Sequence, residues 1–66
     1  MSKLLEWRVQ RGLTRAELGA LLGVSSETIR RWENGSRVPW PRKMVEIYRE
    51  TAGEVHPGDF YEIERK

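Results

Sequence analysis

Two glycines on either side of a leucine pair constrain the fold of this chain more than any other feature. Thr14 and Glu17 stand three residues apart, the spacing of a capping box, which predicts a helix from about Arg15. Glycine in a helix interior costs about 1 kcal/mol relative to alanine, so Gly19 indicates that another helix comes very close there. Gly23 suits the left-handed end of a helix. The segment therefore predicts a short helix that ends in a tight turn.

The apolar residues around these glycines predict a second helix packed on the first. In the first helix they recur at i, i+3 and i+4 and predict one apolar stripe, formed by Leu18, Leu21 and Leu22. Ser25 is a suitable cap for the next helix, and Ile29 and Trp32 would form its buried side. Asn34 and Gly35 would end it. Two short helices joined by a three-residue turn are typical of the helix-turn-helix, which lays its second helix in the DNA major groove.

From about Leu4 to Thr51 the chain resembles the phage Cro and phage repressor family of small DNA-binding domains. The matching motif positions are the small residue Gly19, the turn residue Gly23 and the apolar residues Leu18, Leu22, Val24, Ile29 and Trp32. The ending Trp32-Glu33-Asn34-Gly35 and the later Pro39 also match. The resemblance implies an all-α, lambda-repressor-like helix-turn-helix domain that binds DNA.

Length and composition favour one small domain without a cofactor. We expect residues 1–66 to form a single domain, with the helix-turn-helix at about 15–33 and a C-terminal tail at 54–66. The chain has no cysteine and one histidine, which argues against a disulfide framework or a zinc site. No signal peptide and no apolar run of membrane-spanning length is visible. A cytoplasmic protein is the expectation.

The charge is unevenly distributed along the chain. Residues 8–43 hold eight basic and three acidic side chains, a balance of +5. Residues 44–66 hold three basic and six acidic side chains, a balance of −3. The helix-turn-helix half is therefore the candidate surface for a polyanion, although both halves could also be ordinary solvated surfaces.

The remaining chain predicts a four- or five-helix architecture. Pro41 suits the first position of a helix, and Trp40 before it is the expected boundary. The inward-facing residues of that helix would be Met44, Ile47, Tyr48 and Thr51. The predicted helices are 2 or 3 to 11, 15–22, 26–33, 41–51 and a short fifth from Pro57 through Tyr61.

The second helix of the motif carries the candidate base-reading residues. If Ile29 and Trp32 face the core, Glu27 and Arg31 point most nearly the opposite way at 100° per residue. Arginine binds guanine O6 and N7, and glutamate accepts from cytosine N4. Glu27 and Arg31 could instead form only a surface ion pair. Ser26 lies near the positions that read bases in the resembling family.

Seven side chains are candidates for phosphate contacts. Helix N-termini attract anions, and basic or amide groups at the rim of the motif can hold the DNA backbone. In the resembling family, the position of Arg15 holds the duplex backbone. The alternative for each is an ordinary solvated side chain. The candidates are Arg15, Arg30, Asn34, Ser36, Arg37, Arg42 and Lys43.

The resemblance also implies a buried ion pair between Arg8 and Glu33, where the alternative is two unrelated surface charges. Trp7 and Trp32 are predicted core residues. Trp40 is expected either to pack over the helix that follows it or to lie against the DNA backbone.

The predicted function is a sequence-specific transcription regulator of bacterial or phage type, such as a repressor. It would bind double-stranded DNA as a homodimer on a pseudo-palindromic operator. One alternative is the antitoxin of a toxin–antitoxin pair, with a partner surface formed by Val55, Phe60, Tyr61 and Ile63. Another is a protein-interaction module on the same helices. His56 and Asp59 have no partners that suggest catalysis, so an enzyme is not expected.

Overall fold

The computed structural model describes residues 2–61, and this part of the chain is helical with no strand. Four α-helices and one 3₁₀-helix follow one another, which confirms the predicted all-α architecture with four or five helices. Their bounds are α1 Lys3–Gln10, α2 Arg15–Leu22, α3 Ser26–Asn34, α4 Pro41–Glu50 and η1 Pro57–Phe60.

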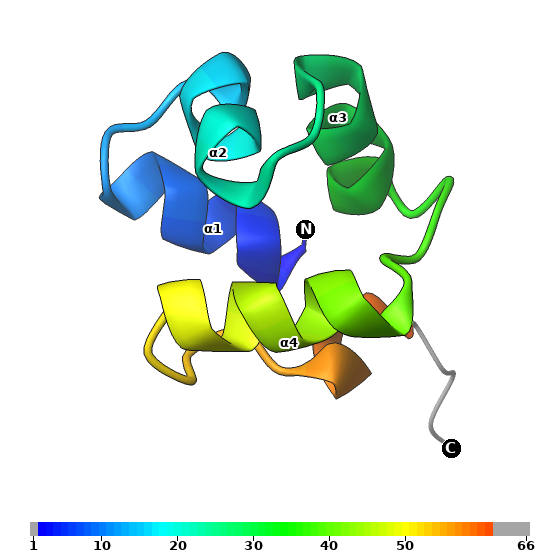
Figure 1. Ribbon diagram of the computed structural model, residues 1–66. Helices are drawn as coiled ribbons and strands as arrows, with labels where there is room; N and C mark the ends of the chain where they lie inside the picture. The colour runs from blue at the N-terminus through cyan, green and yellow to red at the C-terminus, as the bar shows by residue number, and fades with distance from the viewer. Residues whose placement is uncertain (1, 62–66) are drawn as a thin grey trace.

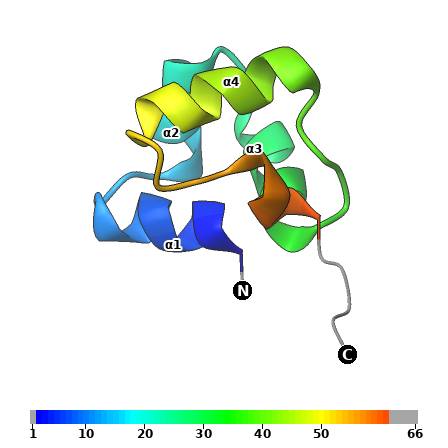
Figure 2. The same cartoon turned by 90° about the horizontal axis from the view of Figure 1, so that it is seen from below.

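The helices form two groups around one core (Figure 1). α2 and α3 lie side by side and contact each other across the turn that joins them. α1 contacts α3, and α4 contacts α2. The 3₁₀-helix η1 folds back between α1 and α4 and contacts both (Figure 2). The motif of α2 and α3 thus packs on α1 and α4, and η1 joins these two helices to each other.

Side-chain caps start the first three helices. The Thr14 hydroxyl accepts from the Glu17 N–H at 3.0 Å, and the Glu17 carboxylate accepts from the Thr14 N–H at 2.8 Å. This confirms the predicted capping box at the start of α2. Ser25 caps α3 in the same way, since its hydroxyl accepts from the Thr28 N–H at 3.1 Å. Ser2 caps α1. These local bonds explain why the helix starts are visible in the sequence.

The core is built from apolar residues of every helix. Trp7 and Trp32 are buried, as predicted. Buried Thr51 is satisfied by its own backbone surroundings, because its hydroxyl donates to the Ile47 carbonyl at 2.8 Å and accepts from the Val55 N–H at 3.1 Å. The central cluster consists of Leu4, Trp7, Leu18, Leu22, Ile29, Trp32, Ile47, Val55 and Phe60.

Two residues predicted to face inward are exposed. Leu21 is 51% exposed, and the buried side of α2 is formed by Leu18, Gly19 and Leu22. The turn after α2 packs on Gly19, which rotates the buried stripe away from Leu21. Tyr48 is 45% exposed and lies at the edge of α4 with its ring beside His56. Both predictions were wrong because the period of apolar residues shows only roughly which side of a helix is buried. The exact side is set by the elements that pack on the helix.

The C-terminal partner surface predicted from the sequence is also wrong in part. Val55 and Phe60 are core residues, so they are not available to another protein. Tyr61 is exposed, and Ile63 lies outside the described residues. Because η1 carries Phe60 into the gap between α1 and α4, this segment completes the fold. The His56 N–H at its start donates to the Asp59 carboxylate at 2.8 Å.

Gly19 is required by the backbone of the turn rather than by a neighbouring helix, which corrects the sequence-based interpretation. A Cβ atom at this position would overlap the Val24 carbonyl oxygen and lie 3.2 Å from the carbonyl carbon of Ser25. Gly23 ends α2 at φ 73°, in the left-handed region. The two glycines therefore let the chain turn closely over α2 before α3 begins.

Replacing Gly19 with alanine should destabilise the domain in spite of alanine's higher helix propensity. The new methyl group meets rigid backbone, and such overpacking costs about 1–3 kcal/mol. Gly58→Ala is the matched control, since a Cβ there meets nothing within 4 Å. Urea denaturation followed by circular dichroism measures both variants. Equal stability of Gly19→Ala and the wild type would contradict the close approach.

Candidate nucleic-acid interface

The two sides of α3 differ sharply in burial and chemistry. Ile29, Trp32 and Glu33 are buried against the other helices. The opposite side is exposed and polar, with two guanidinium groups and a carboxylate among its groups. Its exposed residues are Ser26, Glu27, Arg30, Arg31 and Asn34. The structure thus brings all three predicted base-reading residues, Ser26, Glu27 and Arg31, to one solvent-facing side of one helix.

Glu27 holds both arginines of this side. Its carboxylate accepts from Arg30 Nε at 3.0 Å and from Arg31 Nε at 3.1 Å, and Arg30 Nη2 also donates to it. The surface ion pair considered from the sequence is therefore present, with Arg30 as an additional partner. Hydrogen bonds from Arg30 and then Arg31 lower the pKa of the Glu27 carboxyl to about 2. Glu27 raises the pKa of Arg30 in return.

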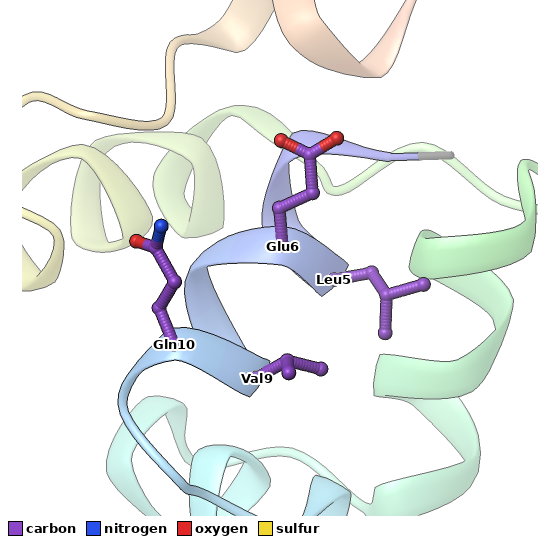
Figure 3. A pocket seen from close by; sticks show the side chains of 4 residues that line it. All are labelled: Leu5, Glu6, Val9 and Gln10. Carbon is purple, nitrogen blue, oxygen red and sulfur yellow. The ribbon is translucent and has the colours of Figure 1, made fainter.

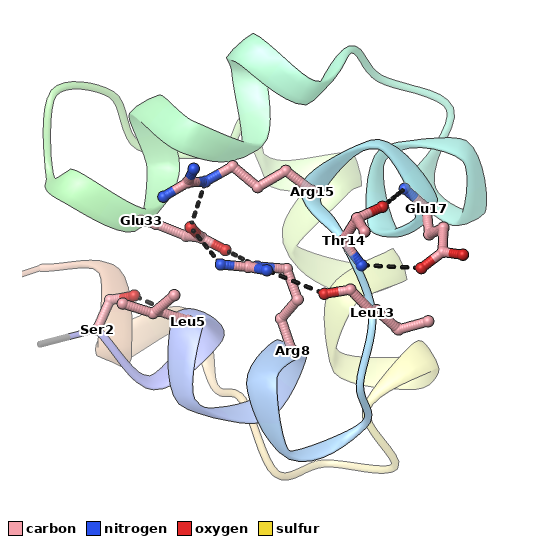
Figure 4. Close-up of polar contacts among 8 residues, drawn as sticks. All are labelled: Ser2, Leu5, Arg8, Leu13, Thr14, Arg15, Glu17 and Glu33. Atoms are coloured by element: carbon pink, nitrogen blue, oxygen red, sulfur yellow. Dashed lines mark hydrogen bonds and ion pairs between the residues drawn. The ribbon is translucent and has the colours of Figure 1, made fainter.

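The buried side of α3 carries a second carboxylate with two arginine partners (Figure 4). Glu33 accepts from Arg8 Nε at 2.6 Å and from Arg15 Nε at 2.9 Å. Arg8 also donates to the Leu13 carbonyl at 2.9 Å. The Glu33 side chain is only 3% exposed, so the structure places the pair expected of Arg8 and Glu33 inside the domain. One carboxylate thus links α1, α2 and α3.

The bond from Arg15 to Glu33 was not anticipated from the sequence. Arg15 was assigned only to DNA phosphate, and 18 residues separate it from Glu33. No local spacing indicates such a contact, because it depends on how α2 and α3 pack. The Arg15 side chain is 44% exposed, and only its Nε is bound to Glu33. Because nearly half of the side chain is exposed, an anion can still reach its guanidinium group.

The loop after α3 presents several further donors. The Ser36 N–H donates to the Asn34 side-chain oxygen at 2.9 Å, which shapes the start of the loop. The Arg37 N–H donates to the Arg31 carbonyl at 3.2 Å. Ser36, Arg37 and Arg42 are all exposed. These residues therefore lie at the surface on the segment between the exposed side of α3 and the first turn of α4.

Lys43, the seventh candidate for a phosphate contact, is not exposed in this way. Its ammonium group donates to the Leu22 carbonyl at the end of α2 and to the Glu46 carboxylate, the latter at 2.7 Å. The side chain is largely buried. A cation at the C-terminal end of a helix satisfies carbonyl groups that have no partner within the helix. We therefore remove Lys43 from the predicted phosphate contacts and assign it to joining α4 to α2.

Trp40 packs against α3. Its ring meets Trp32 edge to face, with centroids 5.8 Å apart and planes at 73°. This contact differs from the predicted packing over the following helix. Half of the Trp40 side chain remains exposed, next to the loop that carries Arg37.

The described residues also include a small apolar hollow on α1 (Figure 3). Leu5 and Val9 project from one side of the helix, with Glu6 and Gln10 beside them. Val9 is well exposed. Within residues 2–61, no cluster of acidic and histidine side chains has the arrangement of a metal site, and no helix is long and apolar enough to cross a membrane.

Two capped helices joined by a tight glycine turn, with the second helix buried on one side and polar on the other, define a helix-turn-helix domain. Residues 4–47 match the family model HTH_3, described as helix-turn-helix. The chain belongs to this family of Cro- and repressor-like DNA-binding domains. Comparisons with curated proteins and with solved structures found no match.

Removing either Arg8 or Glu33 should destabilise the domain strongly. Glu33→Ala leaves Arg8 without its carboxylate, and Arg8→Ala leaves the buried Glu33 with only the half-exposed Arg15. Removing one partner of a buried pair costs about 3–5 kcal/mol. We expect Arg8→Ala and Glu33→Ala each to lower the melting temperature sharply, and the double variant to cost less than the sum. Thermal unfolding followed by circular dichroism measures all three.

Arg15→Ala provides the matched control, because it removes an arginine that binds the same carboxylate from a half-exposed position. Arg15 is half exposed and Arg8 stays on the carboxylate, so this variant should lose much less stability than Arg8→Ala. Small and additive losses for Arg8→Ala and Glu33→Ala would show that the pair is no stronger than a surface contact.

Proposed function

We propose that this protein is a sequence-specific DNA-binding transcription regulator that places α3 in the major groove of double-stranded DNA. The observation that supports this most is the exposed polar side of α3, directly opposite Ile29 and Trp32. A helix fits the major groove, where each base pair presents a distinct pattern of donors and acceptors. Membership of a DNA-binding family supports the same function.

In this proposal Arg31, Glu27 and Ser26 read base edges. The Arg31 guanidinium can donate two hydrogen bonds to guanine, and the Glu27 carboxylate can accept from the amino group of cytosine. The two side chains are bound to each other in the free protein. Arg31 uses only its Nε in this bond, so base reading through Nε or through the Glu27 oxygen that accepts it requires the two to separate.

Phosphate contacts would hold α3 in register along the duplex. The candidates are exposed groups on both sides of the reading surface. Arg15 presents its half-exposed side chain at the start of α2, while the loop after α3 presents its own donors. The proposed phosphate contacts are Arg15, Arg30, Asn34, Ser36, Arg37 and Arg42.

A single small domain offers one reading helix, so we propose that two copies bind one operator. Occupancy of a promoter by such a dimer would repress transcription. A bacterial or phage regulator of this kind acts in the cytoplasm, where its DNA is located.

A protein partner, as in an antitoxin, is a second candidate. The partly buried Leu5 and the exposed Val9 on α1 favour it, since they form an apolar strip outside the proposed DNA surface. Binding to a partner through this strip would be insensitive to salt, whereas binding to DNA weakens steeply as salt rises.

Comparison of Arg31→Ala with Arg37→Ala tests the assignment of the reading side. Arg31→Ala should weaken binding at the preferred site by about 1–3 kcal/mol and relax the choice at one G·C pair. Arg37→Ala should weaken all duplexes alike and reduce the slope of log affinity against log salt by about one unit. Gel-shift titrations at several salt concentrations measure both.

Equal, sequence-independent losses for the two variants would make Arg31 a phosphate contact. No duplex binding by the wild type at about 50 mM salt would exclude the proposed function, because electrostatic attraction to DNA is strongest at low salt.

The preferred site should be pseudo-palindromic. Two reading helices in successive major grooves on one face of B-DNA lie about 34 Å apart, which is one helical turn. Selection of bound duplexes from a random pool should therefore give two related half-sites at that spacing. A selected site without symmetry, bound by one copy of the protein in a gel titration, would contradict dimeric binding.

A further inference from the structure

We propose that Glu27 sets the sequence selectivity of α3 by acting as an internal anion, which holds Arg30 and Arg31 until a suitable DNA site replaces it. This inference rests on the proposed function, since it requires α3 to enter the major groove. It assigns Glu27 a role beyond a contact with one base.

The contacts of the free protein carry the proposal. Both oxygens of the Glu27 carboxylate are occupied, Oε1 by Arg30 Nε at 3.0 Å and Oε2 by Arg31 Nε at 3.1 Å and by Arg30 Nη2. All three side chains are about half exposed. The cluster is therefore held by its own charges at the surface, where DNA would approach, and is not fixed by burial.

Two other exposed arginines close to α3 in the sequence have no carboxylate partner in the described part of the chain. Arg37 and Arg42 are exposed and form no ion pair with any of residues 2–61. A phosphate can bind them without displacing a protein group. DNA can take the bound N–H groups, Nε and Nη2 of Arg30 and Nε of Arg31, only by displacing the Glu27 carboxylate. The protein thus presents two kinds of arginine to DNA. Arg30 and Arg31 are paired with a carboxylate, and Arg37 and Arg42 are not paired with any that the structure describes.

The chemistry of the groove determines which sites can displace Glu27. A phosphate offers only acceptors, so it repels the carboxylate while it attracts the arginines. In the major groove the amino groups of cytosine and adenine are the donors, while guanine O6 and N7 and thymine O4 are acceptors. A carboxylate that loses water without gaining a donor is strongly unfavourable. Every base pair carries one such amino group, so Glu27 disfavours sites that place guanine or thymine, in place of cytosine or adenine, next to its carboxylate.

This effect does not require a strong ion pair. Exposed pairs contribute little to stability, so both arginines can leave Glu27 readily when a better acceptor is present. Selectivity between DNA sequences arises because the Glu27 carboxylate, once the arginines have left it, stays in the groove and needs a base amino group as its new donor. Because the two arginines keep the pKa of Glu27 low, the carboxyl group retains its charge throughout the neutral and mildly acidic range.

Glu27→Gln tests the proposal, because glutamine keeps the shape and an acceptor but removes the charge. Binding to a random-sequence duplex should become about eightfold tighter at about 0.1 M salt, with a salt slope about 0.9 steeper, as expected for one more neutralised phosphate. Affinity for the preferred duplex should change less than about twofold, so the ratio of specific to non-specific affinity falls at least about fourfold.

Glu50→Gln is the matched control. It makes the same change in net charge at an exposed residue, the last of α4, whose C-terminal end lies away from α3 in Figure 1. This variant should change both affinities less than twofold. The Nε–H signals of Arg30 and Arg31 in nuclear magnetic resonance spectra should shift in free Glu27→Gln and stay in place in Glu50→Gln.

The outcomes separate the two proposals. A wild-type protein that does not distinguish between sequences would exclude the proposed function and this inference together. A selective wild type whose affinities and arginine signals are unchanged by Glu27→Gln would overturn the inference alone. So would a loss confined to the preferred site with unchanged binding to random duplex, because Glu27 would then act only as a base contact.

Discussion

The orientation of α3 depends on the close approach of the Val24 carbonyl to Gly19. Without a side chain at Gly19, the turn can cross directly over α2, and Gly23 supplies the left-handed conformation that starts it. Ser25 then caps α3. Because the turn fixes the direction of α3, it also fixes which residues of that helix are buried and which face solvent. The candidate DNA surface is a consequence of this backbone contact.

Two carboxylates on opposite sides of α3 share the same type of partner and differ in burial. Glu33 binds Arg8 and Arg15 with 3% of its side chain exposed, whereas Glu27 binds Arg30 and Arg31 with half of its side chain exposed. Removing a partner from a buried pair is costly, whereas an exposed pair exchanges its partners at little cost. Burial alone therefore suits one group to holding helices together and the other to meeting DNA.

Local chemistry made most of the fold predictable. The bounds of α2 and the start of α3 follow from Thr14, Gly23 and Ser25, whose bonds involve neighbours in the sequence. Burial was less predictable, as Leu21 and Tyr48 show, because the sides that become covered are set by elements distant in the sequence. Phe60 belongs to the core for the same reason.

In the candidate site, too, contacts between sequence neighbours were predictable and contacts between distant residues were not. The spacing of Glu27 and Arg31 on one helix indicated their contact and their common side. The bond of Arg15 to Glu33 and the bond of Lys43 to the end of α2 join residues 18 and 21 positions apart, so they follow only from the packing of helices. Sequence patterns therefore predicted the shared exposed side of Ser26, Glu27 and Arg31 better than the contacts of the charged groups around it.

Intermolecular nuclear Overhauser effects in a complex with a selected duplex test most directly whether the exposed side of α3 reads bases. The account predicts contacts from the side chains of Ser26 and Arg31 to major-groove protons, such as cytosine H5 and the thymine methyl group. Contacts to DNA that arise from α1 or α4, with none from α3, would contradict it.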